Sequence, residues 1–571
     1  MSQFYNLEFG NTQFSQGIGE SEFEGGIGND SICNLDYKKG VLAPPIRLSD
    51  FLLANAPRSA TYTWAGNVVT VTLSSHGLLA GQVVYIDFTS GQGTPDGNYT
   101  LLASPGTNDF TFTLTGSGTG GNCTVKKVIP YMRTIAFAND SNRAVNGALC
   151  LGSEYGSEDG QLYSMDKDFG GASLSLIGVK DTTRNYKLGY SDAIFYNGNY
   201  YITSITNIIK VNAAKTSVQY DWWTATVGGG GVEQSALTAT VAHQMVIAYG
   251  YLYIIDGNKV HRIDSSDNVI NGILELDTDF SLMAIEYHNN KIYLYADKVK
   301  NNLVDASSSD AVFASKGEII IWDGTNIDTS TIERYPVSSP IFTMKSFNGN
   351  LYIWDAYSFG YWNGMTIQSL RKTNGFPKYK CMITYYKDRL YWIDGSEGDT
   401  YLSTNNRVIC FNGKLFYHCI GTGALSGGKF IDAIFRWKGS ALALFANNSD
   451  ENSSDGYTLG FNTLMTVTSS TTVAYSQWYN LTTISYIRKC LLELADVLVS
   501  GSEMTIAVIN QKGEEKTLMT ISYTADGAVR YKEVGSLVDL FTSFRFKIYF
   551  TTSGRPIKRI LLTLETASSP A

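Results

Sequence analysis

The sequence predicts an all-β chain: a β-propeller of about seven blades, with a small β-barrel inserted near the N-terminus and a β-sandwich at the C-terminus. Three observations predict this fold. The first is composition, because the 571 residues include 37 Tyr, 27 Phe and 55 Gly but only 17% charged residues. Aromatic residues suit pleated sheets and glycines suit turns. The second is a recurring hairpin motif, and the third is the pattern of short strands in the regions flanking it.

The hairpin motif is clearest in the stretch FNGNLYIWDAYSFGYWNG, residues 347–364. Asn-Gly favours a type I′ turn, because both central residues of that turn need a positive φ. Related units place turns at residues 147, 198, 250, 290, 349, 388 and 439, at intervals of 39 to 59 residues. A propeller blade takes roughly 40–50 residues. We therefore predict a propeller over residues 130–465. A β-solenoid or two sandwiches are the alternatives, and the units are too long for a solenoid coil.

Three further regions flank or precede the propeller. Residues 1–57 are glycine-rich and weakly periodic, which predicts an extended arm that needs a partner to become ordered; the resemblance described below implies that this arm contacts a ring or tube. Residues 58–129 hold short alternating strands between Gly and Asp-Gly turns, which predicts a small β-barrel. Residues 466–571 hold longer alternating strands, which predicts a β-sandwich. Within it, KCLLELADVL fits either a helix or a strand.

The overall charge and the cysteines narrow the class of protein. A formal net charge of −8 argues against tight binding to nucleic acid, although DNA can slide past such a surface. No signal peptide and no apolar run of membrane-spanning length occurs, so we expect synthesis in a reducing cytoplasm and no membrane insertion. The cysteines are scattered and show no C-x-x-C spacing, so we expect buried thiols rather than disulfides at Cys33, Cys123, Cys150, Cys381, Cys410, Cys419 and Cys490.

Candidate catalytic residues are few. The histidines are His76, His243, His261, His288 and His418. His418 adjoins Cys419, but neighbours in a strand point to opposite faces, so we expect core packing rather than a catalytic pair. A propeller hydrolase would use repeated acidic residues, and Asp256, Asp323 and Asp394 each precede a glycine. Aspartates in turns commonly bond their own backbone. We predict no catalytic residue, no cofactor and no metal site, and expect that the protein is not an enzyme.

Two other stretches invite a ligand. The acidic loop NNSDENSSDG, residues 447–456, fails the calcium-loop pattern because Asp455 displaces the glycine and Phe461 replaces the terminal glutamate. We predict a solvated loop there. The tryptophans in DWW (221–223) and GYW (360–362) are of a type that stacks on sugars, but core packing is the favoured interpretation.

Three parts of the chain together resemble tail proteins of double-stranded DNA bacteriophages. They are GNDSICNLDYKKGVLAPPIRLSDF (28–51), the region 61–128 with HGLLAGQVVYIDF and the run Asn108–Phe112, and the closing region 480–564 ending in FRFKIYFTTSGRPIKRILLTLE. Within that group the chain is most similar to the β-propeller nozzle, the tail-tube closing protein of short-tailed phages.

The resemblance implies a structural virion protein, made in the host cytoplasm and located in the phage tail. Such nozzles form a hexameric ring below the portal and adaptor, extend the DNA-ejection channel and dock fibres or a plug protein. The family has no catalytic residues to carry over. The barrel at 58–129 departs from the better-known nozzles, so a receptor- or glycan-binding tail protein remains the alternative, with its binding residues unknown.

Overall fold

The computed structural model describes residues 4–9, 34–36, 41–43, 46–50, 57–127, 131–137, 148–153, 160–165, 174–178, 192–225, 234–298, 317–372, 380–394, 407–421, 430–437, 441–448, 453–464, 472–535 and 540–566. Short gaps within these ranges fall at residues 79, 92–94, 103–105, 205, 240, 356–357, 387–388, 414–415 and 551–554. All statements below concern these residues.

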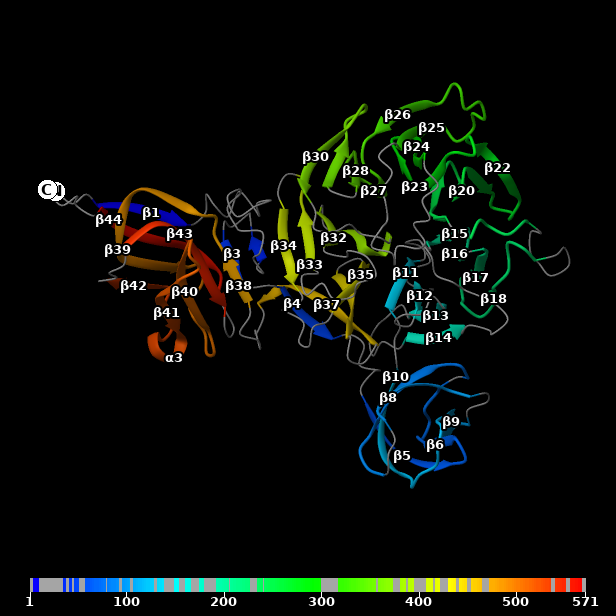
Figure 1. The fold of residues 1–571 in the computed structure, drawn as a ribbon, viewed down its shortest axis with the longest axis horizontal. Coiled ribbons are helices and arrows are strands. Elements are labelled where there is room, and N and C mark those ends of the chain that lie inside the picture. Colours follow the sequence, from blue (N-terminus) through cyan, green and yellow to red (C-terminus); the bar gives the residue numbers. More distant parts are fainter. Residues whose placement is uncertain are drawn as a thin grey trace.

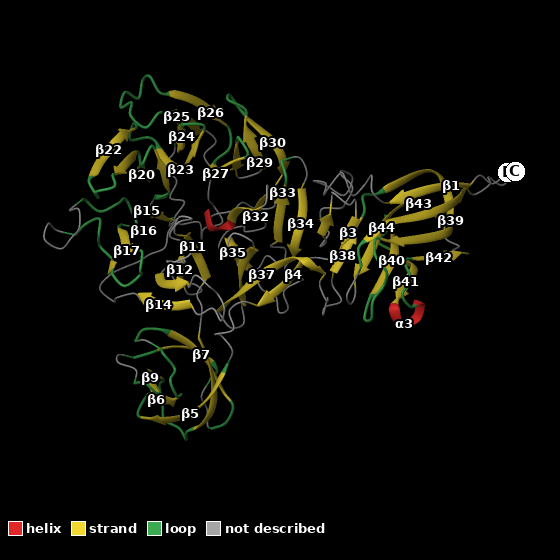
Figure 2. Ribbon diagram, turned by 180° about the vertical axis from the view of Figure 1, so that it is seen from behind, coloured by secondary structure: helices red, strands yellow, loops and turns green. Residues whose placement is uncertain are grey.

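Strands dominate each part of the described chain (Figure 2), which confirms the all-β prediction. Within the described ranges, helical structure is confined to η3 (Lys380–Met382) and α3 (Tyr523–Asp526). The ambiguous segment KCLLELADVL begins inside the long strand β39 (Tyr479–Leu494), so its first half is extended. None of the helices found in the described residues is long and apolar enough to cross a membrane.

Seven four-stranded antiparallel sheets follow one another from residue 131 to residue 464. The first two sheets consist of β11 (Tyr131–Phe137), β12 (Ala148–Ser153), β13 (Gly160–Met165) and β14 (Leu174–Gly178), then β15 (Ala193–Tyr196), β16 (Asn199–Thr203), β17 (Ile208–Asn212) and β18 (Val218–Gln219). The third and fourth consist of β19 (Met245–Ala248), β20 (Tyr251–Asp256), β21 (Lys259–Ile263) and β22 (Val269–Glu275), then β23 (Ser281–His288), β24 (Lys291–Asp297), β25 (Gly317–Trp322) and β26 (Glu333–Val337).

The fifth and sixth sheets consist of β27 (Ile341–Phe347), β28 (Asn350–Asp355), β29 (Ser358–Trp362) and β30 (Ile367–Lys372), then β31 (Ile383–Tyr386), β32 (Arg389–Asp394), β33 (Arg407–Phe411) and β34 (Phe416–Gly421). The seventh consists of β35 (Phe430–Trp437), β36 (Ala441–Asn448), β37 (Ser453–Leu464) and, from the N-terminal region, β4 (Ile46–Asp50).

Tight turns join the first and second strands of these sheets, as the hairpin motif predicts. In the second to fifth sheets the two turn residues are 197–198, 249–250, 289–290 and 348–349, and both residues of each pair have a positive φ. That is the signature of the type I′ turn. The predicted turns at residues 147, 388 and 439 lie outside the described residues.

The sheets are arranged in a ring with their first strands innermost (Figure 1). Consecutive first strands contact each other, as β11 does β15 and β23 does β27, and β11 also contacts β35 of the last sheet. Apolar side chains fill the spaces between neighbouring sheets. One cluster joins the third and fourth sheets through Ile255 and Leu294, and another joins the fifth and sixth through Trp354 and Trp392. Clusters of this kind join each consecutive pair from the first sheet to the sixth.

Residues 58–127 form a separate six-stranded sheet in the order β8-β7-β10-β5-β6-β9, which projects from the ring in Figure 1. Because β8 and β9 also contact each other, the sheet closes into a small barrel. Phe110 and Phe112, alternate residues of the run Asn108–Phe112, are fully buried inside it. Its strands are β5 (Arg58–Ala65), β6 (Val68–Thr72), β7 (Val83–Phe88), β8 (Gly97–Thr100), β9 (Asp109–Thr113) and β10 (Gly121–Lys127).

In the C-terminal region, where the sequence predicts a sandwich, hydrogen bonds join the strands into one ten-stranded sheet. The long strand β39 pairs with three others, β42, β43 and β44, which keeps the sheet continuous. The other members of this ten-stranded sheet are β1, β2, β3, β38, β40 and β41. The bounds are β1 (Phe4–Phe9), β2 (Asn34–Asp36), β3 (Val41–Ala43), β38 (Thr472–Tyr475), β40 (Glu503–Asn510), β41 (Glu515–Ser522), β42 (Tyr531–Gly535), β43 (Leu540–Phe550) and β44 (Ile557–Thr566).

The described parts of residues 1–57 also differ from the predicted arm, because they pair with their own chain. β1 pairs with β44 along its whole length, and Phe9 stacks on Phe546 with ring centroids 5.3 Å apart. β4 pairs with β37 and completes the seventh sheet. Phe9 and Leu42 are fully buried, so apolar contacts within the chain hold β1 and β3 in place.

We expect Trp354→Ala to lower the free energy of unfolding by about 3–5 kcal/mol, because it leaves a cavity between the fifth and sixth sheets. Trp354 is fully buried and its ring lies 5.7 Å from that of Trp392. Urea denaturation followed by circular dichroism measures the change. As a control, Tyr385→Ala replaces a half-exposed side chain and should change the value by less than about 0.5 kcal/mol. Equal effects of the two substitutions would contradict the packing described here.

Candidate functional site

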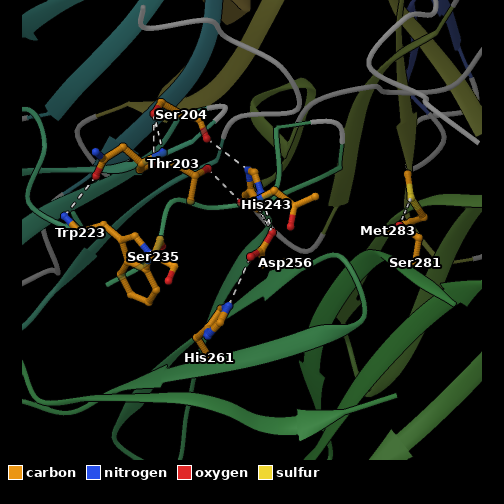
Figure 3. A network of polar contacts seen from close by, with 11 residues as sticks. Thr203, Ser204, Trp223, Ser235, His243, Asp256, His261, Ser281 and Met283 are labelled. Atoms are coloured by element: carbon orange, nitrogen blue, oxygen red, sulfur yellow. Dashed lines mark hydrogen bonds and ion pairs between the residues drawn. The ribbon is translucent and has the colours of Figure 1, made fainter. Parts of the chain in front are cut away.

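A buried His-Asp-His cluster lies at one end of the third sheet, where β19 begins and β20 ends. His243 precedes β19, Asp256 ends β20, and His261 lies in β21. Gly257, with a φ of 58°, helps turn the chain from β20 into β21, so that Asp256 and His261 come together. Figure 3 shows His243 and His261 on opposite sides of the Asp256 carboxylate.

Both oxygens of Asp256 have partners. Oδ1 accepts a hydrogen bond from Nε2 of His243 at 3.1 Å and from the backbone NH of Thr238 at 2.9 Å. Oδ2 lies 3.5 Å from Nε2 of His261. The backbone NH of Gly272 donates to Nδ1 of His261 at 3.3 Å, so the proton of a neutral His261 ring is on Nε2, facing the carboxylate.

His243 faces an acceptor at each ring nitrogen. Its Nδ1 lies 3.1 Å from the carbonyl oxygen of Ser204, while its Nε2 faces Asp256. A carbonyl and a carboxylate can only accept, so the ring makes both hydrogen bonds only when both nitrogens are protonated. The contact between His243 and Asp256 is closed off from solvent, since His243 is 3% exposed and Asp256 9%.

The electrostatics of Asp256 follow from this geometry. Burial by itself raises the pKa of the Asp256 carboxyl, but the hydrogen bonds and charge of His243, the contact with His261 and the NH of Thr238 outweigh it. Together they hold the pKa of Asp256 well below its usual range. The carboxylate is therefore ionised throughout the neutral range.

The cluster continues into the second sheet through Thr203. Its hydroxyl donates to the carbonyl of His243 at 2.9 Å and accepts from the backbone NH of Asp192 at 2.8 Å. On the other side, the Trp223 ring meets His261 edge to face at 5.3 Å, and its indole NH donates to the carbonyl of Ser235 at 2.9 Å. The cluster thus links the second and third sheets through polar contacts, in addition to their apolar packing.

A second set of polar contacts reaches other parts of the ring. Nζ of Lys380, at the start of the sixth sheet, lies 2.9 Å from Oδ2 of Asp192, which precedes the second sheet. The same oxygen accepts from the backbone NH of Met245, and Lys380 also donates to the Met245 carbonyl. Gln244 donates to the carbonyl of Phe342 in the fifth sheet at 3.1 Å. These residues lie at or near the starts of first strands, so they tie non-adjacent sheets together at one end of the ring.

The chemistry of this arrangement is that of a cross-link. The hydroxyl of Ser204, the residue whose carbonyl faces His243, bonds to the Asn207 carbonyl instead of an imidazole. The described ranges contain no group of three or more His, Cys, Asp or Glu placed to hold a metal ion. The cluster orients two imidazoles around one carboxylate, and through His243 it joins the third sheet to Thr203 and Ser204 of the second.

The other predicted candidates lie apart from this cluster. His76 is buried in the barrel, where Nδ1 accepts from the NH of Leu78 at 2.9 Å. His288 is also buried and contacts the hydroxyl of Ser346 at 2.9 Å, and burial lowers its pKa. His418 and Cys419 lie in β34, but their side chains are outside the described residues. Cys123, Cys150, Cys410 and Cys490 are buried.

The three Asp-Gly aspartates have different environments. Asp323 accepts from the backbone NH groups of Thr325 and Asn326, which is the turn bonding that the sequence predicts. Asp256 does not fit that interpretation, since its partners are two histidines and the NH of Thr238. The side chain of Asp394, at the end of β32, is outside the described residues, as is the turn between β36 and β37 in the acidic loop 447–456.

Among the tryptophans considered for sugar stacking, Trp222 and Trp223 are 1% exposed and Trp362 is 7% exposed, so all three belong to the core. Sequence reasoning missed Asp192 and Lys380, which are 188 positions apart and carry no local motif. It also missed Tyr249, an exposed aromatic residue in a hairpin turn. The signal for Tyr249 was present, because Tyr-Gly stands there in place of Asn-Gly.

Comparison with known proteins finds no matching family model and no matching curated protein. Solved structures do match. An exo-β-1,3-galactanase from Phanerochaete chrysosporium with galactose is 10% identical, with a TM-score of 0.26, over 60% of this chain and 98% of that one. The N-terminal domain of Nup159 is 7% identical, with a TM-score of 0.30, over 68% and 97%. A glycoside hydrolase is 10% identical, with a TM-score of 0.26, over 76% and 97%.

This comparison corrects the expectation that the protein is not an enzyme. Glycoside hydrolases are among the solved structures that the chain resembles, so that exclusion does not stand. It rested on the lack of a recognisable catalytic motif, and catalytic groups are assembled by the fold rather than by adjacency in sequence. TM-scores of 0.26 to 0.30 are too low to transfer an activity, a substrate or a site to this chain.

We expect Asp256→Asn to lower the free energy of unfolding by about 3–5 kcal/mol, because it leaves the buried His243 ring without its charged partner. Chemical denaturation at pH 7 measures the loss. Asp323→Asn is the matched control, since Asp323 is an exposed aspartate before glycine whose acceptor role an amide oxygen can fill. Its effect should stay below about 1 kcal/mol. Similar losses for both variants would show that the cluster adds nothing beyond turn bonding.

The contribution of Asp256 should also depend on pH. Its folded-state pKa lies below the ordinary value of 3.8, so its stabilisation is complete above that value and is lost as the pH falls through the folded-state pKa. The stability difference between wild type and Asp256→Asn should shrink as the pH falls below about pH 4. Unfolding curves across this range test it. A difference that shrinks already at neutral pH would contradict the assignment.

Proposed function

We propose that this chain is a structural protein of a bacteriophage tail, forming the nozzle that extends the DNA-ejection channel below the portal and adaptor. The proposal combines the resemblance of residues 28–51, 61–128 and 480–564 with the arrangement of the folded parts. Its finer fold assignment is a β-propeller whose seven blades are the seven four-stranded sheets, with the barrel and the C-terminal sheet attached to it.

The observation that carries the propeller assignment is the contact between β11 and β35, the first strands of the first and last sheets. A row of four-stranded sheets that ended openly would leave two apolar faces in water, whereas closure covers both. β4 supports closure further, because it brings a strand from the N-terminal region into the seventh sheet. That strand precedes the first sheet in sequence, so it joins the two ends of the row.

A mechanical argument supports the tail assignment. One N-terminal segment supplies β1, β2 and β3 to the C-terminal sheet and β4 to the ring. In addition, β2 contacts β34 of the sixth sheet. The ring and the C-terminal sheet are thus connected by paired strands and by a strand contact as well as by a linker. Such connections between the ring and the C-terminal sheet would help a protein that withstands internal pressure and the passage of DNA.

The partners in this proposal follow from the resemblance. They are further copies of the chain in a hexameric ring, the tail adaptor, and fibres or a plug protein. DNA would pass through the lumen of the ring of subunits without specific binding, and the net charge of −8 is consistent with a surface that DNA does not grip. The protein would be made in the host cytoplasm and reside in the virion.

Electron microscopy of particles tests the proposal. Antibody-gold directed at this chain should label the distal part of the tail, and averaged tail images should show a ring with sixfold symmetry at that position. Particles made without the chain should have shortened tails that leak DNA. Complete, DNA-retaining tails without the chain, or label on the capsid, would overturn the proposal.

The alternative is a receptor- or glycan-binding tail protein. The exposed Tyr249 favours it, because the tryptophans that sequence reasoning considered for sugar binding are buried whereas this ring is open to solvent. Binding of the purified protein to host cells, with assembly unaffected by its loss, would favour this role over the nozzle.

A further inference from the structure

The second to fifth sheets each begin with a hairpin whose two turn residues have positive φ. The first of these two residues is Asn197, Asn289 or Asn348 in three of the sheets, but in the third sheet it is Tyr249, with a φ of 51°. Asparagine tolerates this left-handed conformation, whereas a bulky aromatic residue rarely adopts it. Backbone strain of this kind concentrates at functional positions. Tyr249 therefore needs an explanation that the turn does not supply.

The ring of Tyr249 is held in place yet remains open to solvent. Its hydroxyl donates to the carbonyl of Asn290, in the equivalent turn of the fourth sheet, and its ring meets Tyr287 edge to face at 5.3 Å. Gly324 packs closely against the ring. A Cβ at this position would lie 2.8 Å from Cε2 of Tyr249, so only glycine leaves room for the ring. The side chain is nevertheless 42% exposed. We name Tyr249, Tyr287, Asn290 and Gly324 the Tyr249 platform.

Planar polar groups border this platform. Asn289 and Asn290 are exposed, and Asp323, also exposed, lies close enough for its charge to help raise the pKa of Tyr249, although burial raises it more. On the same hairpin, the guanidinium of Arg262 lies 4.4 Å from the ring centroid of Tyr251. Amide and carboxylate groups therefore border the exposed ring of Tyr249, and a guanidinium lies over the neighbouring Tyr251.

We infer that the Tyr249 platform is a carbohydrate-binding site, in which one sugar residue stacks on the ring of Tyr249 and its hydroxyl groups bond to the amide and carboxylate groups at the border. An exposed, immobilised aromatic ring offers contact area at little cost in conformational entropy. Fixed planar polar groups around it provide orientation and specificity. A saccharide matches both, since its pyranose ring has an apolar face and a polar edge.

The charges favour a neutral saccharide over a nucleic acid. Bases also stack on aromatic rings, but sites for single strands add a positively charged groove that follows the phosphates. Here the exposed charges beside the platform are of both signs, Asp323 and Lys291, rather than uniformly positive, and the chain as a whole carries a net charge of −8. The inference goes beyond the nozzle proposal and does not depend on it, because it concerns two neighbouring turns of one subunit.

The test uses the full chain with Tyr249→Asn. This substitution removes the ring but restores the residue found at the equivalent position of the other three turns, so the fold should tolerate it. The probe is a printed array of bacterial surface oligosaccharides, with immobilised oligothymidylate alongside. We expect the wild type to bind at least one saccharide and Tyr249→Asn to bind it at least tenfold more weakly. The thermal midpoint should stay within about 2 °C of wild type.

Two further variants keep the test specific. Tyr249→Phe retains the ring and should keep binding within about threefold, as stacking requires. Tyr531→Asn removes another exposed tyrosine, in the C-terminal sheet, and should leave binding unchanged. The inference is overturned if the array shows no binding, if Tyr249→Asn binds normally, or if that variant loses binding together with thermal stability. Binding of oligothymidylate alone through Tyr249 would also overturn it.

Particle assembly separates this inference from the proposed function. Particles carrying Tyr249→Asn should have complete tails in electron micrographs even where saccharide binding is lost. Shortened tails in this variant would assign Tyr249 to assembly and overturn the carbohydrate site, whereas complete tails with normal saccharide binding would overturn it without touching the nozzle proposal.

Discussion

The structure depends on one constraint: a four-stranded sheet with apolar residues on both faces is not stable alone. Most side chains of β24 are buried, so neither face of that strand tolerates water. Neighbouring sheets supply the cover, which is why the apolar clusters lie between sheets rather than within them. Every sheet has the same need for cover on both faces, and the last sheet meets the first where β35 contacts β11. Closure is thus a consequence of burial.

Polar contacts have a different role in this ring. Apolar packing between sheets is non-directional, so it holds neighbours together without setting their relative height. The Asp256 carboxylate between two imidazoles, and the pair of Lys380 with Asp192, add directional bonds at the inner ends of the sheets. Buried charges are costly unless they are paired and hydrogen-bonded. The pair of Lys380 and Asp192 joins the sixth sheet to the second, so the register between these sheets is a condition of a satisfied interior.

Local features of this fold were predictable from sequence, whereas distant pairings were not. Asn348-Gly349 predicts its type I′ turn, because both residues favour the positive φ that this turn requires. Asp256 precedes a glycine as Asp323 does, yet only the folded chain reveals that His243 and His261 take the place of turn bonding. Lys380 and Asp192 meet because of ring geometry. The pairing of β1 with β44, at opposite ends of the chain, has no local signature either, so the N-terminal region was predicted as an unpaired arm.

The completion of the seventh sheet by β4 has a consequence for biosynthesis. Residues 46–50 leave the ribosome early, but their partner, residues 453–464, is made roughly 400 residues later. Throughout translation the early strand has no mate, and the intervening barrel can fold while the ring stays open. Contacts between such distant segments form late and slowly. The early strand therefore stays unpaired until residues 453–464 have been made, a period in which a chaperone or another copy of the chain can bind it.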